Sequence, residues 1–367
     1  MAKGSPLKLL ILTFEGDMAG STNSIAYLAK GLAQKGHDVF MGLRKEALLW
    51  QLLEGSGVHR IAMTFKGKFD QNNWRQIRDL VWLHGIQIIN AQSSKDRYTS
   101  IFAKWFFRLP VKVIHTRRQM PMSSGGPLQL YLYNKRTDGI VAVSKQVANG
   151  LVDLGIKENH IKVIYNGTPR EKYKSVDSEL TASLRKELGI SSDDFVVGCV
   201  SRMKNQIQIV KALALLTEPV TMIFCGIEAN NEMKEIMESY PVPHKLHFID
   251  QVPGNEILSY YGLFDIKVLA STMEGLSQSL LEAMALGIPV VGTAYAGNLD
   301  LIEEGKNGLL FEDGDIEKLA DQIKKLQNNQ ALRTAFSETG KKTALEKFSI
   351  ENTVRNYEEY FYRLIKE

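Results

Sequence analysis

Residues 271–293 of the chain read STMEGLSQSLLEAMALGIPVVGT. Two carboxylates, Glu274 and Glu282, stand eight positions apart in this stretch, on either side of a Gly-Leu-Ser turn. An apolar segment follows the turn, and we expect it to form a helix that begins near Ser277 or Ser279. The helix should end at Gly287, because a proline that cannot continue it comes two residues later.

The start of this helix is suited to an anion. The first N–H groups of a helix have no partner within it, and the helix dipole favours negative charge there. An anion such as a nucleotide diphosphate can therefore sit at this end, beside the backbone of Gly275, Leu276 and Ser277. Glu274 and Glu282 are then placed to reach hydroxyl groups of a sugar on one side of the diphosphate and of a ribose on the other.

A plainer interpretation of both acids stays open. Residues 279–282 fit a capping box, in which Glu282 would only satisfy a helix end. Glu274 would then be an ordinary solvated acid in a loop. Taken alone, two glutamates at this spacing favour the plainer interpretation, so the rest of the chain has to decide.

Length and composition favour a soluble protein of two domains. The chain has 367 residues, and domains usually contain about 100–200 residues. Hydrophobic residues make up 44% and charged residues 23%, which is ordinary for a globular protein. The first residues lack the apolar core of a signal peptide, and no apolar stretch is long enough to span a membrane. Cys199 and Cys225 lie in apolar segments without metal-ligand spacing, so we expect reduced thiols and a cytoplasmic location.

Charge is divided unevenly along the chain, whose formal net charge is +4. Residues 1–170 contain 24 Lys and Arg against 11 Asp and Glu, which gives 24 − 11 = +13. Residues 171–367 contain 21 against 30, which gives 21 − 30 = −9. A basic first half suggests an anionic partner, for which membrane phospholipid, a phosphorylated acceptor and nucleic acid are candidates. A solvated surface with no partner is the alternative.

The spacing of apolar residues predicts an α/β fold. An apolar run over 7–13 is long enough for a buried strand, apolar residues recur at helical spacing over 25–33, and a second strand opens near Val39. This β–loop–α–β order is the unit of a parallel, doubly wound sheet. Further elements of the first half are a helix over 74–84 and strands over 86–91, 111–115 and 139–143.

A break follows residue 169. Residues 170–179 are polar and lack an apolar period, so we expect a linker there. A second α/β series comes next, with a helix over 210–216 and strands over 195–201, 220–225, 246–249, 266–270 and 289–292. We therefore expect two Rossmann-like domains, 1–170 and 171–348, and an aromatic amphipathic helix over 353–364 within the last segment, 349–367. When two such sheets face each other, the carboxyl ends of both sets of strands line one cleft.

Two cations follow the first strand of the second half. Arg202 and Lys204 can neutralise the two phosphates of a nucleotide-sugar as the bond to the sugar breaks. Without other support, two solvated loop cations would explain the pair better.

Basic residues also gather around the strand predicted over 111–115. His115 stands at its end, where a lone histidine is more often structural than functional. Arg117 and Arg118 follow immediately and are candidates to hold an anionic acceptor.

The stretch around Glu274 resembles the E-x7-E signature of retaining, nucleotide-sugar-dependent glycosyltransferases of the GT-B type (glycosyl transferases group 1, family 4), those grouped with sucrose and glycogen synthases. The resemblance covers nearly the whole chain. It is strong over residues 264–323 and weak over 66–109, the region that usually shapes acceptor choice. It implies an N-terminal acceptor domain, a C-terminal nucleotide-sugar domain, and a last helix that crosses back to pack on the first domain.

Roles for the candidate residues follow from this resemblance. It implies that Glu274 and His115 face the donor sugar and that Glu282 holds the ribose. Arg202 and Lys204 match the family's cation pair and would hold the diphosphate. The histidine would contact a sugar hydroxyl or support developing positive charge through its backbone carbonyl, without acting as a general base.

Two departures from the family pattern concern donor binding. The family usually places several residues between its Arg and Lys, whereas only Met203 separates the two here. It also usually carries two adjacent glycines after the first strand, which let the backbone approach the donor phosphate. This chain has Ala19 and then Gly20, so one glycine remains to let the backbone approach the phosphate. A simple turn explains Gly20 nearly as well.

The expected activity is transfer of a sugar from a nucleotide-diphosphate sugar to a hydroxyl acceptor, in envelope polysaccharide, lipopolysaccharide or glycolipid synthesis. The family implies that the acceptor attacks on the face from which the phosphate leaves, and that the departing phosphate oxygen takes the proton. We expect no metal, because the only Asp-x-Asp, Asp313-Gly-Asp315, is typical of a polar turn before a helix. We expect no cofactor, since the nucleotide-sugar is a substrate, and no nucleic acid partner.

Other functions stay open at this point. An epimerase or a phosphorylase can share the fold, and a requirement for free phosphate would favour the phosphorylase. A non-catalytic module that binds nucleotide-sugar or anionic lipid would bind nucleotide without turnover. A nicotinamide dehydrogenase is disfavoured, because no G-x-G-x-x-G follows the first strand.

Residues 95–118 combine seven Lys and Arg with one acid and a Trp-Phe-Phe run at 105–107. Aromatic rings beside cations suit a bilayer interface, where Lys and Arg meet anionic lipid. We therefore expect that the first domain rests peripherally on the inner membrane face and takes a glycan or lipid-linked acceptor. The alternative is that the aromatic run is the buried side of a helix.

Overall fold

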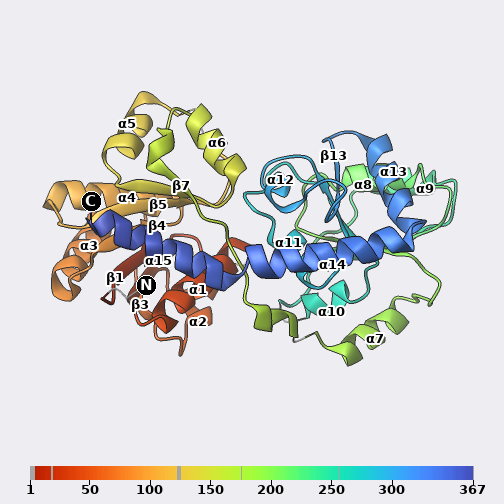
Figure 1. The fold of residues 1–367 in the computed structure, drawn as a ribbon, viewed down its shortest axis with the longest axis horizontal. Helices are drawn as coiled ribbons and strands as arrows, with labels where there is room; N and C mark the ends of the chain where they lie inside the picture. Colours follow the sequence, from red (N-terminus) through yellow and green to blue (C-terminus); the bar gives the residue numbers. More distant parts are fainter. Residues whose placement is uncertain (1–4, 18–19, 122–124, 175, 255, 367) are drawn as a thin grey trace. The chain divides into compact units, whose positions relative to one another are not determined.

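The structure is a computed structural model that describes residues 5–17, 20–121, 125–174, 176–254 and 256–366. The chain divides into two compact units (Figure 1). Unit 1 comprises Met1–Pro169 together with Ser349–Glu367, and unit 2 comprises Arg170–Phe348. Each unit holds one parallel β-sheet, so the predicted fold class of two Rossmann-like α/β units is confirmed.

The sheet of unit 1 has the strand order β3-β2-β1-β4-β5-β6-β7. Its strands are β1 (Lys8–Leu12), β2 (Asp38–Leu43), β3 (His59–Ala62), β4 (Ile88–Ala91), β5 (Lys112–Arg117), β6 (Gly139–Ala142) and β7 (Ile161–Val163). The strand order reverses between β1 and β4. In doubly wound sheets, ligands bind at the carboxyl ends of the strands beside such a reversal.

Seven α-helices belong to the described part of unit 1. They are α1 (Gly20–Gln34), α2 (Leu48–Leu52), α3 (Gln71–His84), α4 (Ser94–Phe107), α5 (Pro127–Lys135), α6 (Lys145–Asp153) and α15 (Ile350–Lys366). The predicted helix over 74–84 corresponds to α3, whose start is capped by Asp70 through a hydrogen bond from the Asn72 N–H.

The last helix, α15, packs in the core of unit 1, against α1. Its residue Tyr357 is fully buried, and the Tyr357 and Thr116 hydroxyls lie 3.1 Å apart in a hydrogen bond. Gly31 on α1 permits the close approach, because a Cβ there would lie 2.4 Å from Cγ2 of Val354. The aromatic amphipathic helix predicted over 353–364 therefore exists, and it is longer at both ends.

The sheet of unit 2 has the order β10-β9-β8-β11-β12-β13. Its strands are β8 (Val196–Val200), β9 (Thr221–Cys225), β10 (Lys245–Ile249), β11 (Ile266–Leu269), β12 (Val290–Thr293) and β13 (Leu309–Phe311). Its described helices are α7 (Ser178–Glu187), α8 (Ile207–Leu213), α9 (Asn231–Glu238), α10 (Ile257–Tyr261), α11 (Gln278–Ala285), α12 (Asn298–Leu301), α13 (Ile316–Gln327) and α14 (Gln330–Lys347). The order reverses between β8 and β11, and the loops that follow these two strands carry Arg202 and Glu274.

Two predictions about local structure are wrong. The expected linker over 170–179 is largely helical, with a 3₁₀ helix at Arg170–Lys174 and the start of α7 at Ser178. The Asp177 side chain caps α7 by accepting hydrogen bonds from two N–H groups of its first turn, so the polar residues there are a helix start. The strand β5 also runs on to Arg117, so His115 lies within the strand and not at its end.

None of the helices in the described ranges combines the length and the apolar character needed to cross a bilayer.

Replacing Gly31 by alanine should lower the free energy of unfolding by up to about 2 kcal/mol, because an overpacking cost of about 1–3 kcal/mol outweighs the gain of about 1 kcal/mol in helix propensity. Val354→Ala removes the atom that the new methyl group would meet. The double variant should therefore lose about 0.5–3 kcal/mol less than the sum of the single losses. Denaturant unfolding of the three variants measures this coupling, and strictly additive losses would contradict the predicted contact.

Candidate functional site

The helix α11 begins as the sequence predicted, with Ser277 as its N-cap. The Ser277 hydroxyl oxygen accepts a hydrogen bond from the Leu280 N–H at 3.3 Å, and the backbone turns left-handed at Gly287 with φ of +79°. Ser279 therefore lies inside the helix and does not cap it. The capping-box interpretation of residues 279–282 is wrong, because Glu282 does not lie at the third position after the actual cap.

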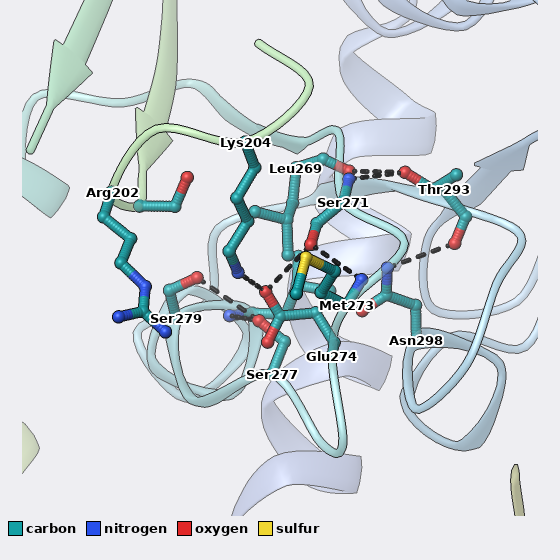
Figure 2. Close-up of polar contacts among 12 residues, drawn as sticks. Arg202, Lys204, Leu269, Ser271, Met273, Glu274, Ser277, Ser279, Thr293 and Asn298 are labelled. Atoms are coloured by element: carbon teal, nitrogen blue, oxygen red, sulfur yellow. Dashed lines mark hydrogen bonds and ion pairs between the residues drawn. The ribbon is translucent and has the colours of Figure 1, made fainter. Parts of the chain in front are cut away.

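Glu274 lies in the loop between β11 and α11, where two groups hold its carboxylate (Figure 2). Its Oε1 atom accepts a hydrogen bond from the Ser271 hydroxyl at 3.2 Å and forms an ion pair with Lys204 Nζ. The side chains of Glu274 and Lys204 are each only 16% exposed. Neither residue is therefore the freely solvated loop residue of the plainer interpretation.

Glu282 has a different pair of partners. The Tyr261 hydroxyl donates to Glu282 Oε2 at 3.2 Å, and Lys172 Nζ forms an ion pair with Oε1. Burial, followed by the Glu282 charge, raises the pKa of Tyr261 well above its ordinary value, so the phenol keeps its proton and donates. The pattern of the sequence did not identify Lys172, which lies in the segment predicted as a linker.

A short loop after β8 carries the two predicted cations. The buried Gln206 side chain holds this loop, since its Nε2 donates to the Ser201 hydroxyl at 2.6 Å and to the Arg202 carbonyl at 2.8 Å. Lys204 turns toward Glu274, whereas the exposed Arg202 guanidinium forms no ion pair with any described residue (Figure 2). Arg202 is therefore a cation that remains available to a ligand.

The turn between Glu274 and α11 presents backbone donors. Within the described residues, the N–H groups of Gly275, Leu276 and Ser277 donate no hydrogen bond. A backbone hydrogen bond holds this turn in place, since the Gly297 N–H donates to the Glu274 carbonyl oxygen at 3.2 Å. A Cβ at position 297 would lie 2.0 Å from the Gly275 carbonyl oxygen, so only glycine permits this contact.

A buried lysine in β11 interacts electrostatically with the two site glutamates, Glu274 and Glu282. Lys267 is fully buried, and its Nζ is 3.5 Å from the Val200 carbonyl oxygen. Burial lowers its pKa, while the thiol of Cys199 and the carboxylates of Glu282 and Glu274 act in the opposite direction. The sequence did carry a signal for it, since it is the one charged residue inside the apolar run of this strand.

The remaining predicted residues belong to unit 1. His115 is fully buried, packs edge-on to the ring of Tyr133 at a centroid distance of 5.2 Å, and makes no hydrogen bond of good geometry with described residues. Burial, followed by the guanidinium groups of Arg97 and Arg117, lowers the pKa of His115 well below its ordinary value. The imidazole is therefore neutral at pH 7.

Arg117 and Arg118 line a cavity of about 390 Å³ at the carboxyl ends of β1, β4 and β5. Gly20 begins α1, and its neighbour Ser21 lines the same cavity. Ala19, the first residue of the expected pair, lies outside the described residues. The structure thus gathers the predicted residues into two groups, one in each unit.

The Asp-x-Asp segment is a turn before a helix, as predicted. Asp315 caps α13 by accepting from the Lys318 N–H, and Asp313 accepts from the side chains of Asn205 and Gln208. Among the described residues, no cluster of three or more His, Cys, Asp or Glu side chains could hold a metal ion.

Cys225 is a buried free thiol, and burial raises its pKa to about 12.

Comparison with protein families gives a match for each unit. Residues 182–343 match the family described as glycosyl transferases group 1, and residues 18–172 match glycosyltransferase family 4. A curated relative, the capsular polysaccharide biosynthesis glycosyltransferase CapM of Staphylococcus aureus, is 26% identical over 306 residues, which cover 76% of this chain and 77% of CapM. The chain spans 60% and 61% of the length of two other curated relatives.

Solved structures share the fold over almost the whole chain. A glycosyltransferase from Rickettsia africae covers 99% of this chain and 100% of its own, with a TM-score of 0.87 and 20% identity. Anabaena HepE in complex with UDP-glucose covers 97% and 100%, with a TM-score of 0.82 and 21% identity. The two family matches together indicate a group 1 glycosyltransferase, and the solved structures share its GT-B fold.

Proposed function

We propose that this protein is a retaining glycosyltransferase that moves a sugar from a nucleotide-diphosphate sugar to a hydroxyl group of a glycan or lipid-linked acceptor, in envelope polysaccharide, lipopolysaccharide or glycolipid synthesis. One observation carries the proposal. In unit 2, two partly buried carboxylates, each paired with a lysine, flank a helix start whose preceding N–H groups are unused. That arrangement suits a diphosphate with a hydroxyl-bearing group on either side.

The donor diphosphate binds against the unused N–H groups of residues 275–277 and the start of α11. Arg202 contributes a free guanidinium, and Lys204 turns from Glu274 to the phosphate when the donor arrives. This exchange releases Glu274 to accept a hydrogen bond from a hydroxyl of the donor sugar. Glu282, already oriented by Tyr261, accepts from the ribose hydroxyls.

Catalysis in this proposal is mainly electrostatic. As the bond from sugar to phosphate breaks, negative charge develops on the diphosphate, and Arg202, Lys204 and the N–H groups stabilise it without a metal. The acceptor hydroxyl attacks on the face from which the phosphate leaves, and the departing phosphate oxygen takes its proton. Configuration at the sugar is thereby retained. His115 is neutral, which fits a contact with a hydroxyl group better than a contact with an anion.

Similar proteins are solved with more than one nucleotide, and starch synthase IV of Arabidopsis thaliana is bound to ADP. HepE is solved with UDP-glucose, and a TarM variant of Staphylococcus aureus is solved with UDP. We therefore propose a UDP-sugar as the first donor to test. Curated relatives are named for capsular polysaccharide, for an N-acetylglucosaminyl L-malate and for D-inositol 3-phosphate, so the acceptor has to be inferred from this chain's own residues.

A thermal-shift panel of UDP-, GDP- and ADP-glucose, followed by anomeric analysis of the product by NMR, tests the function. One donor should stabilise the protein by about 2.7 kcal/mol at a hundred times its dissociation constant. An α-linked donor should then give an α-linked product. An inverted product would contradict the retaining mechanism. Tight nucleotide binding without turnover would indicate a binding module.

Glu282→Gln should weaken binding of free UDP, or of the nucleoside diphosphate that the panel selects, by about five- to tenfold. The variant replaces a charge-assisted hydrogen bond, worth about 1.5–3 kcal/mol, by a neutral one. Titration calorimetry measures the loss. The matched control is Glu303→Gln, an exposed acid of unit 2 whose one ion pair among the described residues is with nearby Lys306. Equal affinities for wild type and a folded Glu282 variant would leave this acid without the proposed role.

We further propose that unit 1 rests on an anionic membrane surface. Trp105 and Phe106 on α4 are 61% and 68% exposed, so they are not the buried side of a helix. The Arg136 guanidinium lies over the Trp105 ring, 5.6 Å from its centroid, which places a cation beside an exposed aromatic ring. Rings with neighbouring cations are typical of residues at the headgroup level of a bilayer.

Sedimentation with phosphatidylglycerol vesicles tests this surface. The protein should bind at low salt and dissociate as salt rises, because each basic residue near the surface contributes about 1 kcal/mol. The double variant Trp105→Ala, Phe106→Ala should bind about tenfold or more weakly, since it loses two rings that bury apolar area in the interface. Leu215→Ser, at an exposed apolar residue of unit 2, is the control. A protein that ignores these vesicles at low salt refutes the membrane proposal.

A further inference from the structure

The cavity in unit 1 is rich in arginine. Three arginines, Arg97, Arg117 and Arg118, border one part of the 390 Å³ cavity, and we call this part the arginine pocket. Arg97 lies in the first turn of α4, Arg117 ends β5, and Arg118 follows it. The residues proposed above to hold the diphosphate and the ribose belong to unit 2, and none of them lines this pocket.

Positive charge in the pocket is not balanced by the protein. Within the described residues, none of the three arginines forms an ion pair with a carboxylate. Arg117 is only 7% exposed, and burial followed by the neighbouring Arg97 lowers its pKa to about 10, so it remains charged at pH 7. Burying guanidinium groups beside one another without a counter-charge is unfavourable. A ligand with negative charge would remove this penalty.

Acidic residues near the pocket do not supply the counter-charge. The buried carboxylate of Asp96 accepts hydrogen bonds from the N–H groups of Phe14, Gln92 and Ser93, and its atoms are committed to this capping structure. Glu15 borders the cavity but is exposed and forms no ion pair with a described residue. Asp96 interacts electrostatically with Arg97, but among the described residues neither acid forms an ion pair with an arginine of the pocket.

Hydrogen-bond donors at the pocket are also unused. Arg118 Nε donates to the Gln92 side-chain oxygen at 3.0 Å and Nη1 donates to the Asn166 side-chain oxygen at 2.8 Å, which fixes the plane of the guanidinium. Its Nη2 atom, the Nε of Arg97 and the Nε2 of Gln92 are enclosed and have no partner among described residues. Buried donors are normally paired, and these three belong to side chains that line one cavity, so the site lacks hydrogen-bond acceptors that a ligand could supply.

We propose that the arginine pocket binds an oxyanion, a phosphate or a carboxylate, carried by the acceptor. The assignment of this ligand as the acceptor depends on the proposed transfer reaction, whereas anion binding itself does not. Guanidinium groups favour both oxyanions, because their N–H groups match the spacing of the oxygen atoms. The start of α4, whose residues Ser93 and Ser94 line the cavity, adds the positive end of a helix dipole.

Calorimetry with three small probes tests the proposal on the full chain. Glycerol 3-phosphate supplies a phosphate, D-glycerate supplies a carboxylate, and glycerol is the neutral control. At least one anionic probe should bind saturably and glycerol should not. Arg117→Gln and Arg118→Gln should each weaken binding of that probe tenfold or more. Arg355→Gln, at an exposed arginine of unit 1, should leave its affinity unchanged. Failure of both anions to bind, or equal affinity in a folded Arg117 or Arg118 variant, would overturn the proposal.

UDP binding in the same variants separates this inference from the proposed function. UDP affinity should be unchanged in Arg117→Gln and Arg118→Gln, since the donor residues lie in unit 2. Loss of anion binding with UDP binding intact supports the arginine pocket. Saturable anion binding without any sugar transfer would refute the proposed function but not the anion-binding proposal. If the two variants also bind phosphatidylglycerol vesicles tenfold more weakly, the oxyanion is a lipid headgroup, and if vesicle binding is unchanged, it belongs to a soluble acceptor.

Discussion

All strands within each sheet run in one direction, and this constraint fixes where chemistry can occur. Parallel strands bring their carboxyl ends to the same edge, so residues distant in sequence meet in the loops that follow them. In unit 2 the loops after β8 and β11 bring Lys204 and Glu274 into an ion pair. In unit 1 the ends of β1, β4 and β5 enclose the arginine pocket. The candidate residues of unit 2 and the arginine pocket of unit 1 therefore both lie where parallel strands end.

The two groups handle charge in opposite ways. Each site acid of unit 2 has a lysine partner, so a donor has to exchange partners with it. The pocket of unit 1 keeps guanidinium groups without carboxylate partners. Binding in unit 2 is therefore an exchange of existing ion pairs, whereas binding in unit 1 adds a counter-charge that the protein lacks. Affinity in unit 1 should consequently depend more strongly on the charge of the ligand.

Local signals in the sequence were enough to predict most of the helices and strands. The start of α11 was predictable because Ser277 follows a Gly-Leu turn and precedes an apolar run, and the central strands were predictable from uninterrupted apolar runs such as that of β1. Lys172 was not predictable as a partner of Glu282, since the two are 110 positions apart and nothing near Lys172 marks it. Gln206 and Arg97 were missed for the same reason, because their roles depend on tertiary contacts. The false linker at 170–179 shows that a polar segment also fits a capped helix start.

The contact between Gly297 and the Gly275 carbonyl has an evolutionary consequence. Position 297 tolerates no side chain, because any β-carbon would overlap a neighbouring peptide group, so selection can keep only glycine there while the turn before α11 is maintained. Met273 and Tyr295 flank the same turn and are exposed. Divergence among descendants of this protein should therefore accumulate at these two positions. The turn offers a fixed backbone bordered by variable side chains, through which sugar preference can change without rebuilding the site.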